Sequence, residues 1–394
     1  MTSGGPVLPD GAKLLHIGMP KTGTTALQHS LWAARARLEE HGAHNVSRRA
    51  HERKVAITAA GNVRSYWAAE HERWQQLAGE FRTSTARRTF WSSESLSLAA
   101  PERIRGLREE LGPAYVVTTI RALAPQLASR WQQGLRRADP LPLDDWLRAR
   151  FAEEPLGGVG AGFVPGQALR RLNPRRVLQD WGAVFGEENL VFVVLDPSDH
   201  TWLLRAFEDL LGVPELLEPS PSRNLSLPLP EAEMLRHLAA AYRGHGGDLD
   251  AWMATAGDTR RIKLRPVVEA APRHQTVRVP RWAAERADEY VADWVEALAS
   301  SGARVLGDVR HLFSDPATHP VEVEVPEVVD VGSAGRMMDA YFRVGLTLPA
   351  PAPSPDPESG AESGAESGAG GLAAVSGRDL LRELRRRALR RRGR

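Results

Sequence analysis

The sequence contains no cysteine. This absence excludes disulfides, thiolate metal sites and cysteine nucleophiles, and it fits a reducing compartment. The first residues, MTSGGPVLPDGAK, lack the basic start and the apolar stretch of a signal peptide. No run approaches the roughly 18 apolar residues that span a membrane. Together these absences predict a soluble cytoplasmic protein.

Positive and negative charges nearly balance in this sequence. The chain has 51 Lys and Arg against 49 Asp and Glu, a formal net charge of +2. Proteins that bind nucleic acid usually carry a clear basic excess, so we expect no nucleic-acid partner. The 394 residues, 42% of them hydrophobic, suffice for one large domain or two ordinary ones.

Several short runs are apolar almost throughout, which is typical of strands covered on both faces of a parallel sheet. The runs are Lys13–Gly18, Tyr115–Arg121 and Asn189–Asp196, with a weaker one at Thr89–Glu94. Apolar residues also recur at helical spacing. They do so at Leu27, Leu31, Ala34 and Leu38, and again at Val177, Leu178, Trp181, Val184 and Phe185. The alternation predicts an α/β protein with a three-layer, P-loop-like fold, in which helices flank a central parallel sheet.

The composition changes towards the C-terminus. Residues 349–377 are rich in Pro, Gly, Ser and Glu and predict a disordered linker. Residues 378–394 place leucines on one side of a helical pattern that is otherwise crowded with arginine. Such a basic amphipathic tail favours weak contact with an anionic partner or a membrane surface, and solvated disorder is an equal alternative. Residues 229–348 predict helices over the site, most clearly at Pro280–Ser300.

The stretch KLLHIGMPKTGTTALQHSLW, Lys13–Trp32, has the frame of a phosphate-binding loop. Gly18 and Gly23 stand five residues apart between a predicted strand and a predicted helix, and Thr24 and Thr25 follow. In such a loop, backbone N–H groups converge on an anion and glycine allows close approach. The threonines add hydroxyl donors.

The lysine of this loop is displaced. In nucleotide triphosphatases it follows the second glycine and reaches the β- and γ-phosphates. Here Thr24 occupies that place, and Lys21 stands two residues before Gly23. A lysine at this point suits a leaving group whose bridging oxygen gathers charge near the turn.

The motif PKTGTTALQ, Pro20–Gln28, resembles the 5′-phosphosulfate loop of sulfotransferases that use 3′-phosphoadenosine 5′-phosphosulfate (PAPS). The resemblance implies a bacterial member of that family and covers about Lys13–Leu229. It also implies that residues 1–348 form a sulfotransferase domain. PAPS would be the co-substrate, and no metal would be required.

The family must recognise the 3′-phosphate of the donor, and the resemblance implies an arginine at a strand end with a serine about two helical turns later. Arg121 and Ser129 stand at that spacing. Arg223, in SRNLSLP, resembles the late basic residue that helps hold the same phosphate. The chain lacks the R-K-G-x-x-G form of the cytosolic animal enzymes, which leaves Arg223 the weaker assignment.

The resemblance also implies roles in catalysis. Lys21 would donate to the bridging oxygen, and Glu94 would take the proton of the acceptor as general base. His29 and His16 are alternatives, since both lie beside the loop, and Glu94 could instead cap a helix or pair with a basic side chain. The 5′-phosphate would be held by the loop residues Lys21, Thr22, Gly23, Thr24 and Thr25.

The leading hypothesis is therefore a cytoplasmic PAPS-dependent sulfotransferase. It would move a sulfuryl group to a hydroxyl, or an amine, of a small-molecule or carbohydrate acceptor. Two alternatives remain open at this point. One is a P-loop nucleotide kinase, and the other is a non-catalytic nucleotide-binding scaffold.

Overall fold

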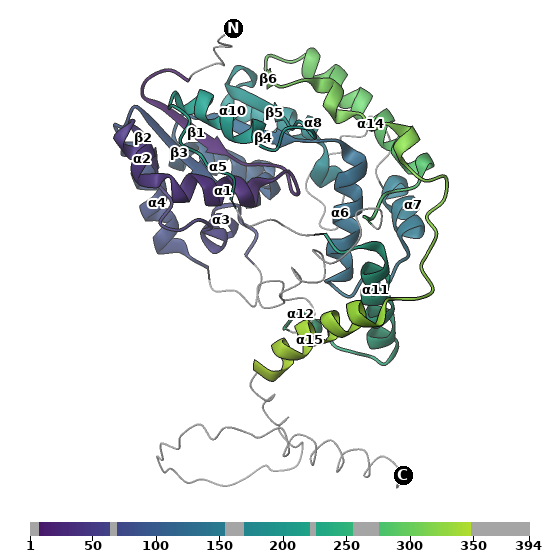
Figure 1. Cartoon of the computed structure of the whole chain (residues 1–394). Helices are drawn as coiled ribbons and strands as arrows, with labels where there is room; N and C mark the ends of the chain where they lie inside the picture. The colour runs from purple at the N-terminus through teal and green to yellow at the C-terminus, as the bar shows by residue number, and fades with distance from the viewer. Residues whose placement is uncertain (1–7, 64–68, 154–168, 221–225, 255–275, 348–394) are drawn as a thin grey trace, which may run out of the picture. The chain divides into compact units, whose positions relative to one another are not determined.

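The computed structural model describes residues 8–63, 69–153, 169–220, 226–254 and 276–347 (Figure 1). The chain divides into two units, Met1–Thr347 and Leu348–Arg394, and all described residues belong to the first. The predicted linker at 349–377 and the predicted basic tail at 378–394 lie outside the described residues.

A parallel sheet of six strands organises the first unit, with the order β2-β3-β1-β4-β5-β6. Every pairing between neighbouring strands is parallel. The strands are β1 (Ala12–His16), β2 (Ala43–Asn45), β3 (Arg88–Ser92), β4 (Tyr115–Ile120), β5 (Leu190–Val194) and β6 (Arg304–Leu306). The predicted α/β fold with a central parallel sheet is confirmed.

The two strands at the edges of the sheet, β2 and β6, were not predicted. Each has three residues, too few to show a periodic apolar pattern. The four predicted runs are strands, but each ends one or two residues earlier than expected. The residue just after a strand can still bond to the neighbouring strand, as Ile17 N–H does to the carbonyl of Val117 (2.9 Å) and Ser93 N–H to that of His16 (2.9 Å).

Side chains of successive residues point to opposite faces of the sheet, so each strand feeds two cores. In β5, Phe192 belongs to one core, and Val191 and Val193 belong to the other. The smaller core is covered by α1 (Thr24–Ala33), α2 (Arg35–Glu40) and α10 (Trp202–Leu211). The predicted apolar stripe of Leu27, Leu31, Ala34 and Leu38 is buried there. The stripe lies on two helices rather than one, because the helix breaks at Ala34 (ψ 3°).

The larger core lies on the other face of the sheet. Its helices include α3 (Arg53–Ala59), α4 (His71–Thr83), α5 (Pro101–Leu111), α6 (Leu123–Leu135), α7 (Leu143–Glu153) and α14 (Arg281–Ala299). The predicted helix before β5 consists of α8 (Pro174–Arg176), a π-helical turn at Val177–Trp181 and α9 (Gly182–Phe185). Its apolar side chains are buried as expected, except that Val184 is only partly buried.

The region after residue 228 is largely helical, as predicted. It contains α11 (Leu229–Gly244), α12 (Leu249–Ala254), α14 and α15 (Val331–Thr347). Both α11 and α14 pack against α6, and α15 packs against α11. Figure 1 shows α6 standing between the sheet and these later helices. α6 therefore contacts α11 and α14 and, through Gln126, also contacts the loop after β1.

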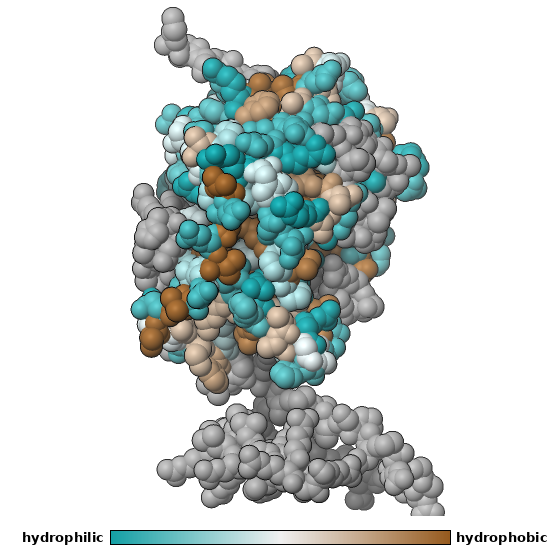
Figure 2. All heavy atoms as spheres, turned by 90° about the vertical axis from the view of Figure 1, so that its right-hand side faces the viewer, coloured by the Kyte–Doolittle hydropathy of each residue, from teal (hydrophilic) through white to brown (hydrophobic). Residues whose placement is uncertain are grey.

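The side formed by α14, α7 and α11 is shown in Figure 2, where polar side chains cover most of the surface and apolar ones are scattered among them. Among the described residues, no helix is both long and apolar enough to cross a membrane.

The burial of Phe192 predicts a large effect of its truncation. The side chain is fully buried in β5, and we expect Phe192→Ala to lower the free energy of unfolding by about 3–5 kcal/mol. Urea unfolding followed by circular dichroism measures the change. Val325→Ala, at a side chain that is 51% exposed, is the control and should change it by no more than about 0.5 kcal/mol. Equal effects of the two changes would contradict the core assignment.

Candidate active site in the loop after β1

The loop that joins β1 to α1 contains an unusual backbone. Gly18 and Gly23 have positive φ angles of 52° and 78°, and Lys21, between them, has a φ of 70°. Lys21 and Ala138 are the non-glycine residues with positive φ in the described part of the chain. A side chain in this region costs about 1–3 kcal/mol, and such residues concentrate at functional sites. The strain at Lys21 therefore marks the loop as a candidate site.

The first glycine permits a close approach of two other residues. A Cβ atom at Gly18 would lie 2.4 Å from Cγ2 of Thr24, which no real side chain allows. It would also lie 3.4 Å from Cβ of Glu94. Gly18 thus lets the start of α1 and the residue after β3 meet at the loop.

Three side chains hold the loop in its strained form. Thr22, which is buried, donates its hydroxyl to the carbonyl of Met19 (2.7 Å) and lies 2.5 Å from the Thr119 hydroxyl of β4. Arg121 Nη1 donates to the Lys21 carbonyl (3.2 Å). Gln126 Nε2, from α6, donates to the carbonyl of Pro20 (2.6 Å). With three carbonyls occupied in this way, the loop turns those oxygens towards the protein.

The N-terminus of α1 completes the loop. Gly23 is its N-cap without a side-chain cap, and the first turn contains no acidic residue. The first N–H groups of a helix lack partners within it and attract anions. The Thr22 hydroxyl is used inside the protein, so this residue offers only its backbone N–H. Thr24 is buried and Thr25 half-buried. The arrangement can bind a phosphate or another anion.

The ammonium of Lys21 lies in an electropositive, poorly hydrated place. The pKa of Lys21 is lowered from 10.5 to about 8, chiefly by burial and in addition by the charges of Arg136 and Arg130. Glu94 acts in the opposite direction. The charges that act on Lys21 thus come from a carboxylate that follows β3 and from arginines of α6 and its C-cap.

The pKa values of the arginines near Lys21 are lowered by burial as well. Burial lowers the pKa of Arg130 to about 10, with Arg171 and Arg137 contributing. Burial also lowers the pKa of Arg136 and of Arg121. Positive charges that lower one another's pKa favour binding of an anion among them.

The carboxylate of Glu94 is held from the side of α1. Gln28 Nε2 donates to Glu94 Oε2 (3.1 Å) and to the carbonyl of Ser92 (3.1 Å). Gln28 Oε1 accepts from Nδ1 of His51, whose ring lies edge to face with that of His29 at 4.6 Å between centroids. Glu94 begins the 3-10 turn Glu94–Leu98 without capping it. The capping alternative is thus not what the structure shows.

His16 is unsuited to proton transfer at neutral pH. It is fully buried in β1, its Nδ1 lies 2.7 Å from the hydroxyl of Ser92, and its Nε2 has no partner. Burial lowers its pKa to about 3, because the charged form of the ring loses its solvation in the protein interior. A neutral, packed His16 supports the sheet below the loop.

Two of the residues predicted to bind the 3′-phosphate, Arg121 and Ser129, are described by the structure. Arg121 directly follows β4 and contacts the loop, and Ser129 lies half-buried in α6, three residues after Gln126. Arg223 lies outside the described residues. Trp131, near Ser129 in sequence, is buried and donates to the carbonyl of Leu141 (3.0 Å).

Sequence reasoning missed several residues that the structure brings to the loop. They are Gln28, His51, Gln126, Arg130 and Arg136. One signal was available, because Gln126 and Arg130 are four residues apart on one face of a predicted helix. The approach of His51 depends on packing between distant segments and left no local pattern.

Comparisons with known proteins yield one likeness. No family model and no curated protein matches the chain. Among solved structures, it is similar to a sulfotransferase from Alicyclobacillus acidocaldarius, with 16% identity and a TM-score of 0.34, over 63% of this chain and 99% of that one. At this identity and TM-score, the likeness adds no weight to the argument from the site.

The lowered pKa of Lys21 predicts a pH-dependent stability. Between about pH 8 and 10.5 the unfolded chain keeps the proton that the folded protein has lost, so this group's contribution to stability rises with pH. Below pH 8 the buried charge is destabilising. We therefore expect Lys21→Met to raise the melting temperature at pH 7, by an amount that shrinks at pH 9.5.

Thermal melts in chloride buffers, which avoid phosphate in the loop, measure this difference. Lys54→Met, at an exposed lysine of α3, is the matched control and should show no such trend. A Lys21→Met variant that melts lower than the wild type at pH 7 would show that the ammonium is well solvated or paired.

Proposed function

We propose that the protein is a PAPS-dependent sulfotransferase, which moves a sulfuryl group to a hydroxyl, or an amine, of a small-molecule or carbohydrate acceptor. Residues 1–348 would form the catalytic domain, and Arg223 would contribute to the donor site. The cytoplasmic location stays a prediction. The proposal rests on the chemistry of the loop rather than on the structural likeness.

The observation that carries the proposal is the backbone of Lys21. A lysine held at a φ of 70°, ahead of the second glycine, stands on the turn itself and not on the first turn of the helix. A lysine in the first turn of the helix, as in nucleotide triphosphatases, reaches the β- and γ-phosphates of a nucleotide. A lysine on the turn is placed to stabilise charge on an oxygen that bridges the bound phosphate and a transferred group.

The donor would then occupy the loop and the start of α6. The N–H groups of Gly23, Thr24 and Thr25 would surround the 5′-phosphate. Arg121 and Ser129 would receive the 3′-phosphate, since Arg121 contacts the loop and Ser129 lies in α6 three residues after Gln126, which also contacts the loop. A second phosphate held by Arg121 and Ser129 would distinguish this donor from adenosine monophosphate.

Transfer would proceed in line between acceptor and donor. The acceptor oxygen would bond to sulfur as the bond from sulfur to the bridging oxygen breaks. Glu94 would take the acceptor proton, and the electron pair would stay on the bridging oxygen, which Lys21 stabilises. Gln28 orients the Glu94 carboxylate for this role (3.1 Å).

A nucleotide kinase is the second candidate, because its loop has the same glycine frame. Kinases of this class bind magnesium with an acidic residue at a strand end. Asp196, which follows β5, instead accepts the N–H (2.7 Å) and the hydroxyl (2.6 Å) of Ser198. That local use of its carboxylate favours the sulfotransferase.

The donor site predicts a ranking of nucleotides. We expect 3′-phosphoadenosine 5′-phosphate (PAP) to bind more tightly than 5′-AMP or magnesium ATP, because it alone supplies an anion to Arg121 and Ser129. Calorimetry should show this preference, and Arg121→Ala should weaken PAP by about tenfold to a hundredfold. Arg105→Ala, at an exposed arginine of α5, is the control. Tighter binding of magnesium ATP would favour the kinase.

Catalysis predicts a separation of binding from transfer. Lys21→Ala and Glu94→Gln should each slow sulfuryl transfer by about a hundredfold or more, because each removes one contribution to the transition state. Both should still bind PAP. Release of radioactive sulfate from labelled PAPS, with water as the acceptor, measures the rate.

His29→Ala is the matched control, at the other candidate base beside the loop. It should keep the wild-type rate. A loss of transfer in His29→Ala with retention in Glu94→Gln would reverse the assignment of the base, and retention in Lys21→Ala would remove the basis of the mechanism.

A further inference from the structure

One face of α6 continues the site beyond the loop. Gln126, Arg130 and Gln133 recur at helical spacing, and Gln126 contacts the loop at Pro20 (2.6 Å). Arg130 Nη1 donates to Gln133 Oε1 (2.7 Å). Arg136 caps the end of α6, about 15 Å along the helix from Gln126. Polar and basic groups thus follow α6 away from the donor loop.

Three polar groups near this face are buried without a hydrogen-bond partner. They are Nε of Arg130, Nε of Arg136 and the hydroxyl of Tyr341. The first two act electrostatically on Lys21, and Arg136 also acts on Tyr341, which α15 contributes. A buried donor without a partner has lost its hydrogen bonds to water and gained none, so native proteins seldom keep such donors without a reason. A ligand that accepts from all three would remove this cost.

These groups remain donors at every physiological pH. The pKa of Arg130 is lowered only to about 10, and burial raises that of the Tyr341 phenol to about 12. Two guanidinium groups and a neutral phenol suit an oxyanion, which accepts several hydrogen bonds and carries charge.

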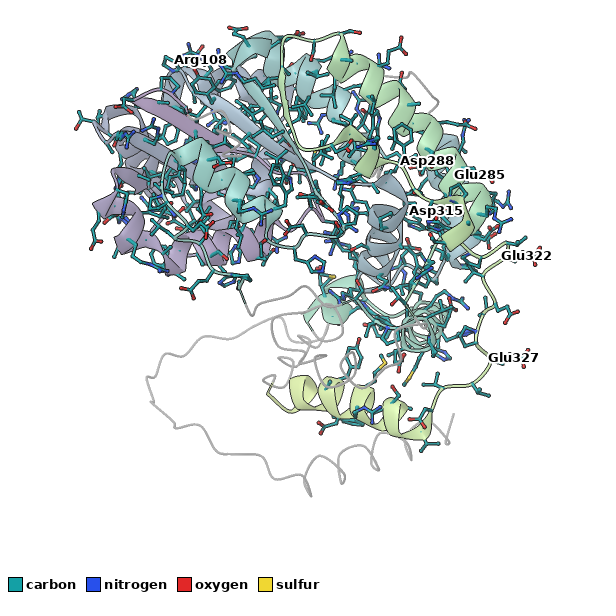
Figure 3. All side chains as sticks on the ribbon, turned by 45° about the horizontal axis from the view of Figure 1, so that its top comes forward. Arg108, Glu285, Asp288, Asp315, Glu322 and Glu327 are labelled. Atoms are coloured by element: carbon teal, nitrogen blue, oxygen red, sulfur yellow. The ribbon has the colours of Figure 1, made fainter. Side chains whose placement is uncertain are left out.

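No carboxylate of the described residues forms an ion pair with Arg130 or Arg136, whereas many other arginines there do form one. Figure 3 labels Glu285 and Asp288, which lie on α14, and Asp315, which lies on the segment that follows it. Asp288 is occupied by the backbone N–H of Ser314 (2.9 Å). Within the described part of the chain, no ion pair therefore neutralises the charge of these two arginines, which favours an anionic ligand there.

We propose that Arg130, Arg136 and Tyr341 form a subsite for an anionic group of the acceptor, beside Lys21 and separate from the donor phosphates. The inference rests on the proposed function, which assigns the loop, Arg121 and Ser129 to the donor. The acceptor is then a hydroxyl or amine compound that also bears a carboxylate, a sulfate or a phosphate. Its anion anchors it, and its nucleophile reaches the sulfur between Lys21 and Glu94.

The experiment asks whether a second anion binds when PAP already fills the donor site. Sulfate, malonate or phosphate is titrated into the PAP complex, and sodium chloride of equal ionic strength corrects for screening. We expect a saturable rise in melting temperature with at least one of the three anions, since a ligand that binds the folded state stabilises it. The anion that acts at the lowest concentration identifies the class of acceptor group.

Variants locate the second anion. Arg136→Gln and Arg130→Gln should each raise the anion concentration for half-saturation by at least about tenfold, and Tyr341→Phe should raise it less. The affinity for PAP should stay within about threefold of the wild type. Arg105→Gln, on the surface of α5, is the matched control and should change neither quantity.

Two outcomes would overturn the proposal. One is a PAP complex with no saturable response to any of the three anions. The other is a loss of PAP affinity in Arg130→Gln or Arg136→Gln, which would assign these arginines to the donor. Failure of the wild type to bind PAP would be a different result, because it would refute the proposed function itself.

Discussion

Positive charge that gathers around the loop after β1, without an equal negative charge, is the constraint on which the site depends. Burial lowers the pKa of four basic side chains near this loop, which disfavours their charged forms. They are Lys21, Arg121, Arg130 and Arg136. A protein keeps such an arrangement only where the rest of the fold compensates for it. Here two hydrophobic cores on either face of the parallel sheet supply that stability.

The strained backbone of the loop and the positive charges around it both favour the binding of an anion. Lys21 adopts a positive φ because Thr22, Arg121 and Gln126 occupy loop carbonyls and leave the N–H groups for an anion. Arg121 directly follows β4 and Gln126 lies in α6, at the point where the strand order changes direction beside β1. Ligands of open α/β sheets bind at such a point, outside the carboxyl ends of the strands.

More of the fold than of the candidate site could be predicted from the sequence. The buried strands have continuous apolar runs, and the loop has glycines at fixed spacing, so both were predictable from local pattern. The position of Glu94 at the carboxyl end of β3 followed from the same pattern. The hydrogen bond from Gln28 did not, because it joins residues that are 66 apart in the chain. Arg130 and Arg136 were visible only as ordinary helical arginines, whose solvation no sequence shows.

The sequence by itself determined the parallel sheet, the glycine loop and the presence of a lysine within it, since each depends on neighbouring residues. Tertiary structure alone decided which charges surround that lysine. Burial and nearby charges set the pKa of Lys21. Burial also leaves polar atoms of Arg130, Arg136 and Tyr341 without hydrogen-bond partners. Both effects require the folded protein, because only folding removes these groups from water.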